Sequence, residues 1–256
     1  MTDLSKAVSA EFLKLKRTLA VRLAVAAPLA VVLLNFFIYS QGRGADTPGA
    51  NPLIGFAQIN FTMWTILVLP LYVALAAALV AGVDHQSNGW KQMLALPVSR
   101  QSVFASKWMA AAALVLLSAV VFAFGISIAA LVLRAIRPTF RSASIPAGLV
   151  TLRSLQTFGA ACLIVSIHTW VSLRYRTFIA GLGLGIGGVF ILLGGVARSG
   201  LGTFIVYVYP WALPPTAMAR MWETHADRWF VTAWGIVAGT LIAILGSWRL
   251  SRRDSV

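Results

Sequence analysis

The sequence predicts an all-α polytopic membrane protein with six transmembrane helices. Of its 256 residues, 59% are hydrophobic and only 11% are charged, whereas soluble domains carry about 25% charged residues. The apolar residues are gathered in runs of about 20 or more, the length that a helix needs to cross the lipid core. These runs predict helices because lipid offers backbone groups no hydrogen-bond partner outside the helix itself.

Residues 1–17 predict an amphipathic helix in the lipid headgroup plane on the cytoplasmic side. An apolar stripe recurs at helical spacing, and the basic residues lie away from it. The stripe consists of Leu4, Val8, Phe12 and Leu15. A signal peptide fits less well, because the amphipathic segment is long and the apolar run that follows is long enough to span.

The remaining residues, 18–256, predict one membrane domain. The six spans are expected at about 19–39, 59–83, 103–133, 149–173, 178–197 and 229–248. The segment 198–228 is too long for a turn, and it predicts a pair of short re-entrant or surface-lying helices rich in Tyr and Trp. The single cysteine, Cys162, excludes an intramolecular disulfide and fits no metal motif.

The longest polar interruption, residues 84–107, separates the second and third spans. Apolar residues recur within it at i, i+3, i+4 and i+7, which is one face of a short helix. They are Trp90, Met93, Leu94 and Pro97. The predicted helix, Gly89–Leu96, either lies on lipid or docks on another protein, and a solvated interfacial loop is the third alternative.

The distribution of basic residues predicts the orientation in the membrane. With both termini on one side, that side holds thirteen of the 21 basic residues, and the other side holds eight. The positive-inside rule then places both termini and the Gly89–Leu96 helix in the cytoplasm. The net charge of +14 comes from residues at span ends, so it does not indicate nucleic-acid binding.

The fourth and fifth spans contain the candidate residues for transport and for helix packing. Polar groups at membrane depth mark functional sites, and such groups in the fourth span are candidates to line a substrate path. They are Arg153, Gln156 and His168. The alternatives are snorkelling of Arg153 to the interface and a bond from His168 to a backbone carbonyl.

Glycines four residues apart in the fifth span predict close packing between helices. The pairs are Gly181 with Gly185 and Gly183 with Gly187. The same run matches the dinucleotide motif G-x-G-x-x-G, but that motif needs a strand before it and a βαβ unit. A dinucleotide site is therefore excluded.

The sequence predicts no catalytic residue, cofactor site or metal site on this chain. It contains no P-loop and no H-E-x-x-H motif. The acids lie outside the spans, which argues against an ion-coupled transporter. Ser166 and His168 are two residues apart and face different sides of a helix, so they form no catalytic pair. A stand-alone carrier or channel remains the alternative function.

Three segments resemble permeases of the ABC-2 exporter superfamily, most closely the bacitracin and lantibiotic-immunity type. The first is AEFLKLKRT, Ala10–Thr18, and the third is YPWALPP, Tyr209–Pro215. The second follows the second span and combines an acid, a Gly, Leu-Pro-x-Ser-Arg and a Lys. Its residues are Asp84, Gly89, Leu96, Pro97, Ser99, Arg100 and Lys107. The chain departs from the family pattern at Asp84, where Glu is usual, and at Trp90, where a small residue or Thr is usual.

The resemblance implies a permease whose Gly89–Leu96 helix couples to a separate ATP-binding subunit, which carries ATP and Mg²⁺. The implied coupling interface consists of Asp84, Gly89, Trp90, Lys91, Met93, Leu94, Leu96, Pro97 and Arg100. Further implied partners are a second permease, identical or a sister subunit, and membrane lipid. The expected cargo is amphipathic, such as an antimicrobial peptide or a lipid-like molecule, exported across a bacterial plasma membrane.

Overall fold

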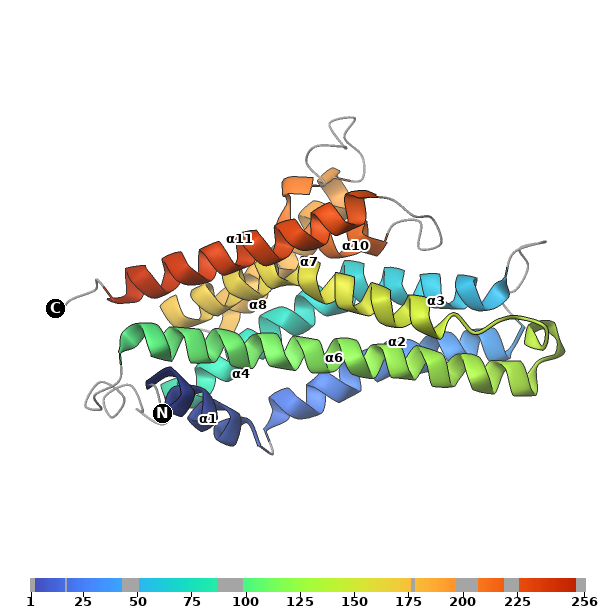
Figure 1. Cartoon of the computed structure of the whole chain (residues 1–256), viewed down its shortest axis with the longest axis horizontal. Helices are drawn as coiled ribbons and strands as arrows, with labels where there is room; N and C mark the ends of the chain where they lie inside the picture. The colour runs from blue at the N-terminus through green and yellow to red at the C-terminus, as the bar shows by residue number, and fades with distance from the viewer. Residues whose placement is uncertain are drawn as a thin grey trace.

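The computed structural model describes residues 3–16, 18–42, 51–86, 99–175, 178–196, 207–218 and 226–251. Within these ranges the chain consists of helices joined by turns and short loops, so the all-α prediction is confirmed for them. The long helices run roughly along one common axis (Figure 1). Among the described residues, five helices are long and apolar enough to cross a membrane.

The first two helices meet at a tight corner. Helix α1 (Asp3–Leu15) lies where the amphipathic helix was expected, and α2 (Leu19–Ser40) follows as the first span. Between them, the Thr18 hydroxyl donates a hydrogen bond to the Leu15 carbonyl at 2.8 Å. Leu15 is buried in the main core, whereas Phe12 on the same helix is exposed. Helix α1 therefore packs on the bundle with one edge and leaves apolar surface open.

The second span consists of α3 (Pro52–Met63), the π-helical turn η1 (Trp64–Val68) and α4 (Leu69–Gln86). Its apolar helix, Pro52–Gly82, has 31 residues and starts seven residues before the expected boundary. The side chain of Asn51 caps it by accepting from the Leu53 N–H at 3.0 Å. In η1 the Leu69 N–H bonds to the Trp64 carbonyl. Because Pro70 has no N–H to donate, the wider turn lies where regular pairing is interrupted.

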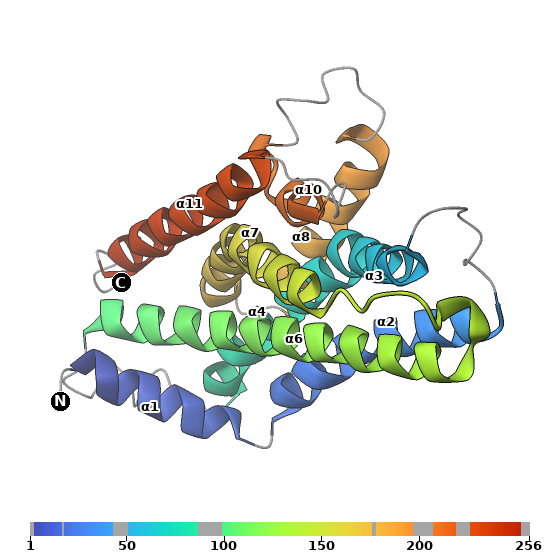
Figure 2. The same ribbon diagram turned by 45° about the vertical axis from the view of Figure 1, so that its right-hand side comes forward.

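Helix α7 is the central element of the bundle. The third span, α6 (Arg100–Ile136), leads through the 3-10 turn η2 (Pro138–Phe140) into α7 (Ala147–Arg174). In the most apolar stretch of α7, 72% of the residues are buried, compared with 28% for α2 and for α11 (Ala226–Ser251). Figure 2 shows α7 in the middle of the bundle, where it contacts α11, α6, α4 and α10.

The expected fifth span contains a shorter helix, α8 (Phe178–Ile191, 14 residues), followed by the π-helical turn η3 (Leu192–Val196). Its length is below the roughly 20 residues of a full crossing, so the count of six spans is not confirmed. Helices α7 and α11 both run toward the end of the bundle where α1 lies (Figure 1). The chain between them must therefore travel back along the bundle, and α8 makes the first part of that return.

The short helices before the last span are buried. Turn η4 (Pro210–Ala212) and helix α10 (Leu213–Met218) pack against α3, α7 and α11. Trp211, Leu213 and Met218 are all buried. The described part of this region is therefore packed inside the bundle, and its re-entrant or surface-lying character stays a prediction.

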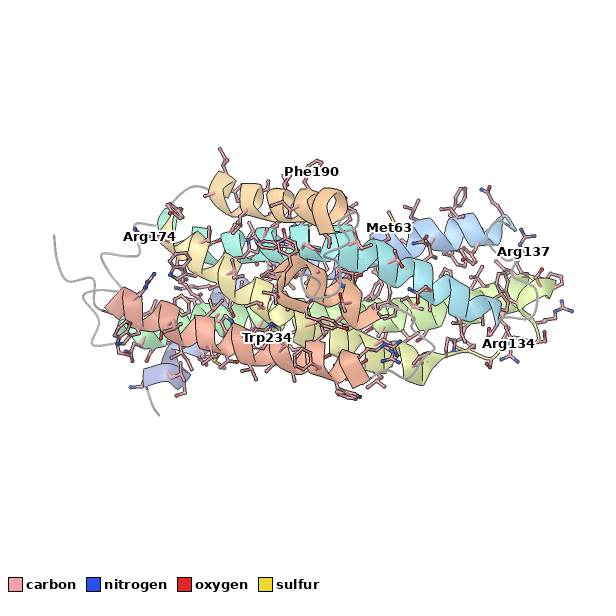
Figure 3. The ribbon with its side chains drawn as sticks, turned by 90° about the horizontal axis from the view of Figure 1, so that it is seen from above. Met63, Arg134, Arg137, Arg174, Phe190 and Trp234 are labelled. Atoms are coloured by element: carbon pink, nitrogen blue, oxygen red, sulfur yellow. The ribbon has the colours of Figure 1, made fainter. Side chains whose placement is uncertain are left out.

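The outer surface and the two ends differ in character. Phe190 and Trp234 are exposed on the sides of the bundle, as are many other large apolar residues. Arg134 and Arg137 lie at one end of the long axis and Arg174 lies at the other (Figure 3). Apolar sides with basic ends are the pattern of a multi-pass membrane protein whose long axis crosses the bilayer.

Candidate functional site

The predicted coupling interface is placed only in part. Asp84 lies near the end of α4, and Arg100 is the first residue of α6. The other members of the predicted interface lie outside the described residues: Gly89, Trp90, Lys91, Met93, Leu94, Leu96 and Pro97. The structure therefore shows the two helices that the segment connects, and the coupling role of the segment stays a prediction.

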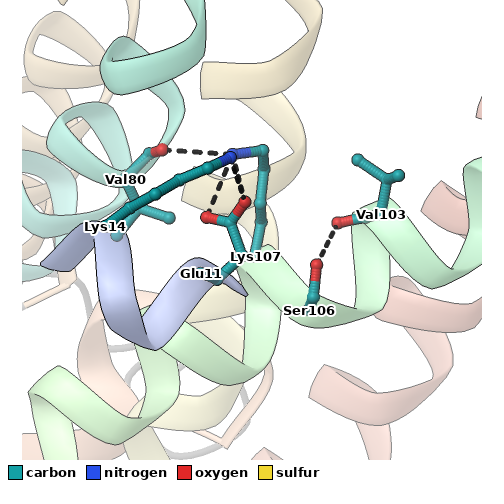
Figure 4. A network of polar contacts seen from close by, with 6 residues as sticks. All are labelled: Glu11, Lys14, Val80, Val103, Ser106 and Lys107. Atoms are coloured by element: carbon teal, nitrogen blue, oxygen red, sulfur yellow. Dashed lines mark hydrogen bonds and ion pairs between the residues drawn. The ribbon is translucent and has the colours of Figure 1, made fainter. Parts of the chain in front are cut away.

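A buried lysine joins three helices beside that segment. Lys107 Nζ on α6 lies 3.3 Å from Glu11 Oε1 and 3.2 Å from Glu11 Oε2, both on α1. The same ammonium donates to the Val80 carbonyl of α4 at 3.3 Å (Figure 4). The side chain of Lys107 is 0% exposed and that of Glu11 is 5% exposed. We call these three residues the Lys107 junction.

The pairing explains why a charged residue can occupy this position in an apolar helix. Moving an isolated ammonium out of water costs about several kcal/mol of solvation free energy. An ion pair with further hydrogen bonds offsets that cost. Lys14, one turn after Glu11, adds a second cation at 3.0 Å from the carboxylate. Glu11 thus accepts from two lysines and orients α1 against α6.

Sequence reasoning did not connect Glu11 with Lys107. Both residues carried a signal, because Lys107 lies within an apolar run and Glu11 interrupts an amphipathic segment. The criterion that selected Arg153, a charge at membrane depth, applies equally to Lys107. The partner was not predictable, because 96 residues separate the two in sequence.

Two of the three residues predicted for a substrate path lie together. Arg153 Nη1 donates to Gln156 Oε1 at 2.6 Å, and both side chains are buried. Arg228 of α11 is also buried, and Thr232, one turn later, donates to the Gln156 carbonyl at 3.4 Å. This basic cluster lies between α7 and α11. Both alternatives for Arg153, a substrate path and snorkelling to the interface, stay predictions.

His168 lies elsewhere on α7. It is twelve residues from Gln156, which at 1.5 Å per residue is about 18 Å along the helix. Its ring is fully buried and meets the Trp211 ring edge-on, with 5.9 Å between the centroids. Neither ring nitrogen has a hydrogen-bond partner among the described residues. The three candidates therefore do not form one site, and their role in transport stays a prediction.

The four glycines predicted for helix packing fall on two sides of α8. A Cβ built on Gly181 would lie 3.2 Å from Ser172 Oγ, and one on Gly185 would lie 3.0 Å from the Ala74 Cβ. A Cβ on Gly183 or Gly187 meets nothing within 4 Å. Within the described chain, only the first pair faces other helices.

The closest backbone approach occurs at two other glycines, which were not among the predicted packing residues. A Cβ on Gly235 would lie 2.6 Å from the Ala160 Cα, and one on Gly239 would lie 2.7 Å from the Cys162 carbonyl. These residues are also four apart, so the same G-x-x-x-G spacing could have identified them. They allow α11 to lie directly against α7.

Tyr209 ties the segment that contains η4 and α10 to α8. Its hydroxyl donates to the Gly188 carbonyl at 2.7 Å, and its ring lies 5.4 Å from that of Trp211. A Cβ on Gly188 would overlap the Trp211 ring. Burial raises the pKa of the Tyr209 phenol above its ordinary value. Burial therefore favours the neutral phenol, which donates this hydrogen bond.

The described residues contain no group of three His, Cys, Asp or Glu side chains that could hold a metal ion. A comparison with protein families matches residues 7–194, well over half of the chain, to the family described as ABC-2 family transporter protein. No curated protein matches the chain. The matched range includes the whole Lys107 junction and ends after α8.

Proposed function

The chain belongs to the ABC-2 transporter family, and we propose that it is the permease subunit of an ATP-driven exporter. The family implies a partner subunit that binds ATP. In this proposal the present chain is not catalytic, and ATP and Mg²⁺ bind only to the partner. The membrane domain supplies the path and changes conformation when the partner moves.

The observation that carries the proposal is the position of the Lys107 junction. Val80 lies four residues before Asp84, and Lys107 lies seven residues after Arg100. The two helices that enter and leave the predicted coupling segment are therefore bonded to each other and to α1 at one buried point. A force applied to the segment would reach α1, α4 and α6 together.

Coupling requires that the partner binds two conformations of the permease with different affinity. We propose that the ATPase grips the apolar face formed by Trp90, Met93 and Leu94, and that closure of the ATPase pair displaces this helix. Because the junction resists relative sliding of the three helices, the displacement moves them as a unit. That unit then reorients against α7 and α11.

We further propose an amphipathic cargo, such as an antimicrobial peptide or a lipid-like molecule. Two features support this class. The sides of the bundle are apolar and exposed. The basic cluster of Arg153, Gln156 and Arg228 places buried polar groups between α7 and α11, where the polar part of an amphipathic cargo could bind. The lantibiotic-immunity type rests on the resemblance of the three sequence segments alone.

The assembly that we propose contains two permeases, identical or sister subunits, in a bacterial plasma membrane with both termini cytoplasmic. The positive-inside count supports this orientation. Helix α1 and the last turns of α11 lie at the same end of the bundle (Figure 1), as a cytoplasmic location of both termini requires.

The test is co-purification from the native host in mild detergent. We expect an ATPase of domain size to accompany the wild-type chain and to be lost from Trp90→Ala/Leu94→Ala, because a few buried apolar anchors dominate docking energies. The matched control is Phe124→Ala/Ile128→Ala, which truncates two exposed apolar residues on the side of α6. That variant should retain the ATPase.

The outcomes separate the two functions that the sequence left open. If no ATPase accompanies any of the three proteins, the stand-alone carrier or channel becomes the better interpretation. If the ATPase remains on the Trp90/Leu94 variant, the permease function stands and the assigned coupling helix is wrong. Loss from the control as well would show that general instability, and not docking, explains the result.

A further inference from the structure

A cavity of about 300 Å³ lies at the end of the bundle that carries the Lys107 junction, between α6, α7 and α11. Phe104 and Trp170 form part of its apolar wall, and both belong to a small core cluster that joins these helices. Arg174 and Arg249 supply the charged part of the lining. No function assigned above uses this cavity.

The two arginines lie at the expected level of the lipid headgroups. The membrane-crossing helices Ala147–Arg174 and Arg228–Arg249 end at these two residues. Each guanidinium carries a full positive charge, which outweighs the roughly half negative charge of the helix end beside it. The cavity is therefore electropositive at the depth where phosphate groups of a bilayer lie.

No acidic side chain that the structure describes lines the cavity. Glu11 is the only acidic residue whose side chain the structure describes, and it is paired with Lys107 and Lys14. Two cations that share one cavity repel each other unless an anion lies between them. Arginine forks match the oxygens of a phosphate in a bidentate way, which favours a phosphate as that anion.

Aromatic rings and a glycine shape the site. The Arg174 guanidinium lies 5.9 Å from the centroid of the Tyr175 ring, a cation–π distance that restrains its direction. A Cβ on Gly246 would come within 2.8 Å of the Phe104 ring and 3.0 Å of the Trp170 ring. Any larger residue at this position would displace the ring that lines the cavity.

An exposed apolar strip leads away from the arginines along α11. Its residues recur at i, i+4 and i+7, and they are Leu241, Leu245 and Trp248. Leu245 precedes Arg249 by four residues, so the two lie on the same side of the helix. An acyl chain can lie along this strip while its headgroup meets Arg249.

We propose that this cavity binds the phosphate group of an anionic phospholipid, held by Arg174 and Arg249, with the acyl chains along the exposed strip of α11. A cavity of this size is at the lower limit for small-molecule pockets, about 300 to 1,000 Å³. It therefore holds a headgroup and not a whole lipid. Inorganic phosphate shares the charge but lacks the chain that the strip would contact.

The test is lipid binding to the full chain in neutral detergent, measured by native mass spectrometry during titration with short-chain phosphatidylglycerol. The variant is Arg174→Gln/Arg249→Gln. The control, Lys6→Gln/Arg22→Gln, removes two exposed cations from α1 and the first turn of α2, and neither lines the cavity. We expect the variant to bind at least about tenfold more weakly and the control to stay within about twofold, because only the variant loses forked contacts to phosphate.

Three results would overturn the proposal. Unchanged binding by the variant would remove the arginines from the site, and equal loss in the control would indicate only a basic surface. Competition by inorganic phosphate as effective as that of the lipid would assign the site to a soluble phosphate. Short-chain phosphatidylcholine, which is zwitterionic, should bind more weakly than phosphatidylglycerol, and equal binding would contradict recognition of an anion.

A second variant distinguishes weaker lipid binding from a folding defect in the Gln variant. Arg174→Lys/Arg249→Lys keeps both charges but loses the fork, so we expect binding between that of the wild type and the Gln variant with unchanged thermal melting. Wild-type affinity in this variant would contradict the forked contact. These measurements need no ATPase, so their failure is distinguishable from failure of the proposed permease function.

Discussion

Lys107 Nζ lies 3.2 Å from Glu11 Oε2, and this buried ion pair fastens the N-terminal helix to the third span. The two residues are 96 positions apart. A buried pair contributes little net stability compared with apolar residues of similar size, but loss of one partner leaves a costly unpaired charge. The junction therefore makes specific predictions about single and double substitutions.

Glu11→Gln should destabilise the protein, by at most about 3–5 kcal/mol, because it removes a carboxylate from the buried Lys107 ammonium. The measurement is thermal melting in detergent. The double variant Glu11→Gln/Lys107→Met should recover most of the loss, since it removes both charges together. Lys14→Gln is the control. Its side chain is 31% exposed, so it should cost less than about 1 kcal/mol. If the double variant loses as much stability as Glu11→Gln and Lys107→Met lose together as single variants, the pair is not coupled.

Gly239→Ala should destabilise the contact between α7 and α11. The added methyl group would lie 2.7 Å from the Cys162 carbonyl, and overpacking of this kind costs about 1–3 kcal/mol. Gly183→Ala and Gly187→Ala are matched controls in a neighbouring helix, because their Cβ atoms meet nothing within 4 Å. A lower melting temperature for Gly239→Ala alone is the expected result. If the two controls instead alter the oligomeric state at constant melting temperature, the predicted packing role of that pair lies between subunits.

Asn60→Leu should weaken the contact between α2 and α3. Asn35 Nδ2 donates to Asn60 Oδ1 at 3.3 Å, and both residues are buried. Hydrogen bonds between membrane helices contribute about 0.6 kcal/mol on average and about 2 kcal/mol at most. Gln58→Leu serves as the control, because the Gln58 amide bonds only to Thr62 of its own helix among the described contacts. Chemical denaturation in mixed micelles should rank Asn60→Leu as the less stable variant, and the reverse order would contradict the role of this pair.

Tyr209 should make stability fall at alkaline pH. Its folded pKa is raised by burial, above an unfolded value near 10. The neutral phenol is therefore favoured in the folded state, so its contribution is complete below about pH 10 and is lost as the pH rises through the folded pKa. Tyr209→Phe should show a smaller decline in melting temperature above pH 10 than the wild type. An identical decline in both proteins would assign the alkaline effect to other groups.

Long apolar runs predicted most of the fold. The first, third, fourth and sixth expected spans coincide, to within a few residues, with helices that are long and apolar enough to cross a membrane, because the requirement for about 20 apolar residues is local. The helix at the second expected span begins seven residues earlier, at Pro52. Asn51 and Pro52 form a capped helix start, and the Gly- and Pro-rich composition around them was interpreted as loop.

Contacts distant in sequence were not predictable in the same way. The spacing of glycines identifies helices that can pack closely, but it does not say which partner they meet. Gly235 and Gly239 show the same spacing as the predicted pairs, and only the fold reveals that they face α7. For the same reason Arg153 and His168, chosen by one criterion, lie about three turns apart on a helix whose neighbours were unknown.

The burial of α7 has a consequence for how the chain enters the membrane during synthesis. Among the long apolar helices that the structure describes, Ala147–Arg174 is the least apolar and has the largest buried share, 72%. It is therefore the helix least able to partition into lipid alone. Its neighbour α11 is translated more than fifty residues later. When α7 leaves the translocon, the face of α7 that carries Arg153 is therefore not yet packed against α11. Ribosome-arrested chains that end before α11 should be held by insertion factors or degraded, and only the complete chain should be released as a stable protein.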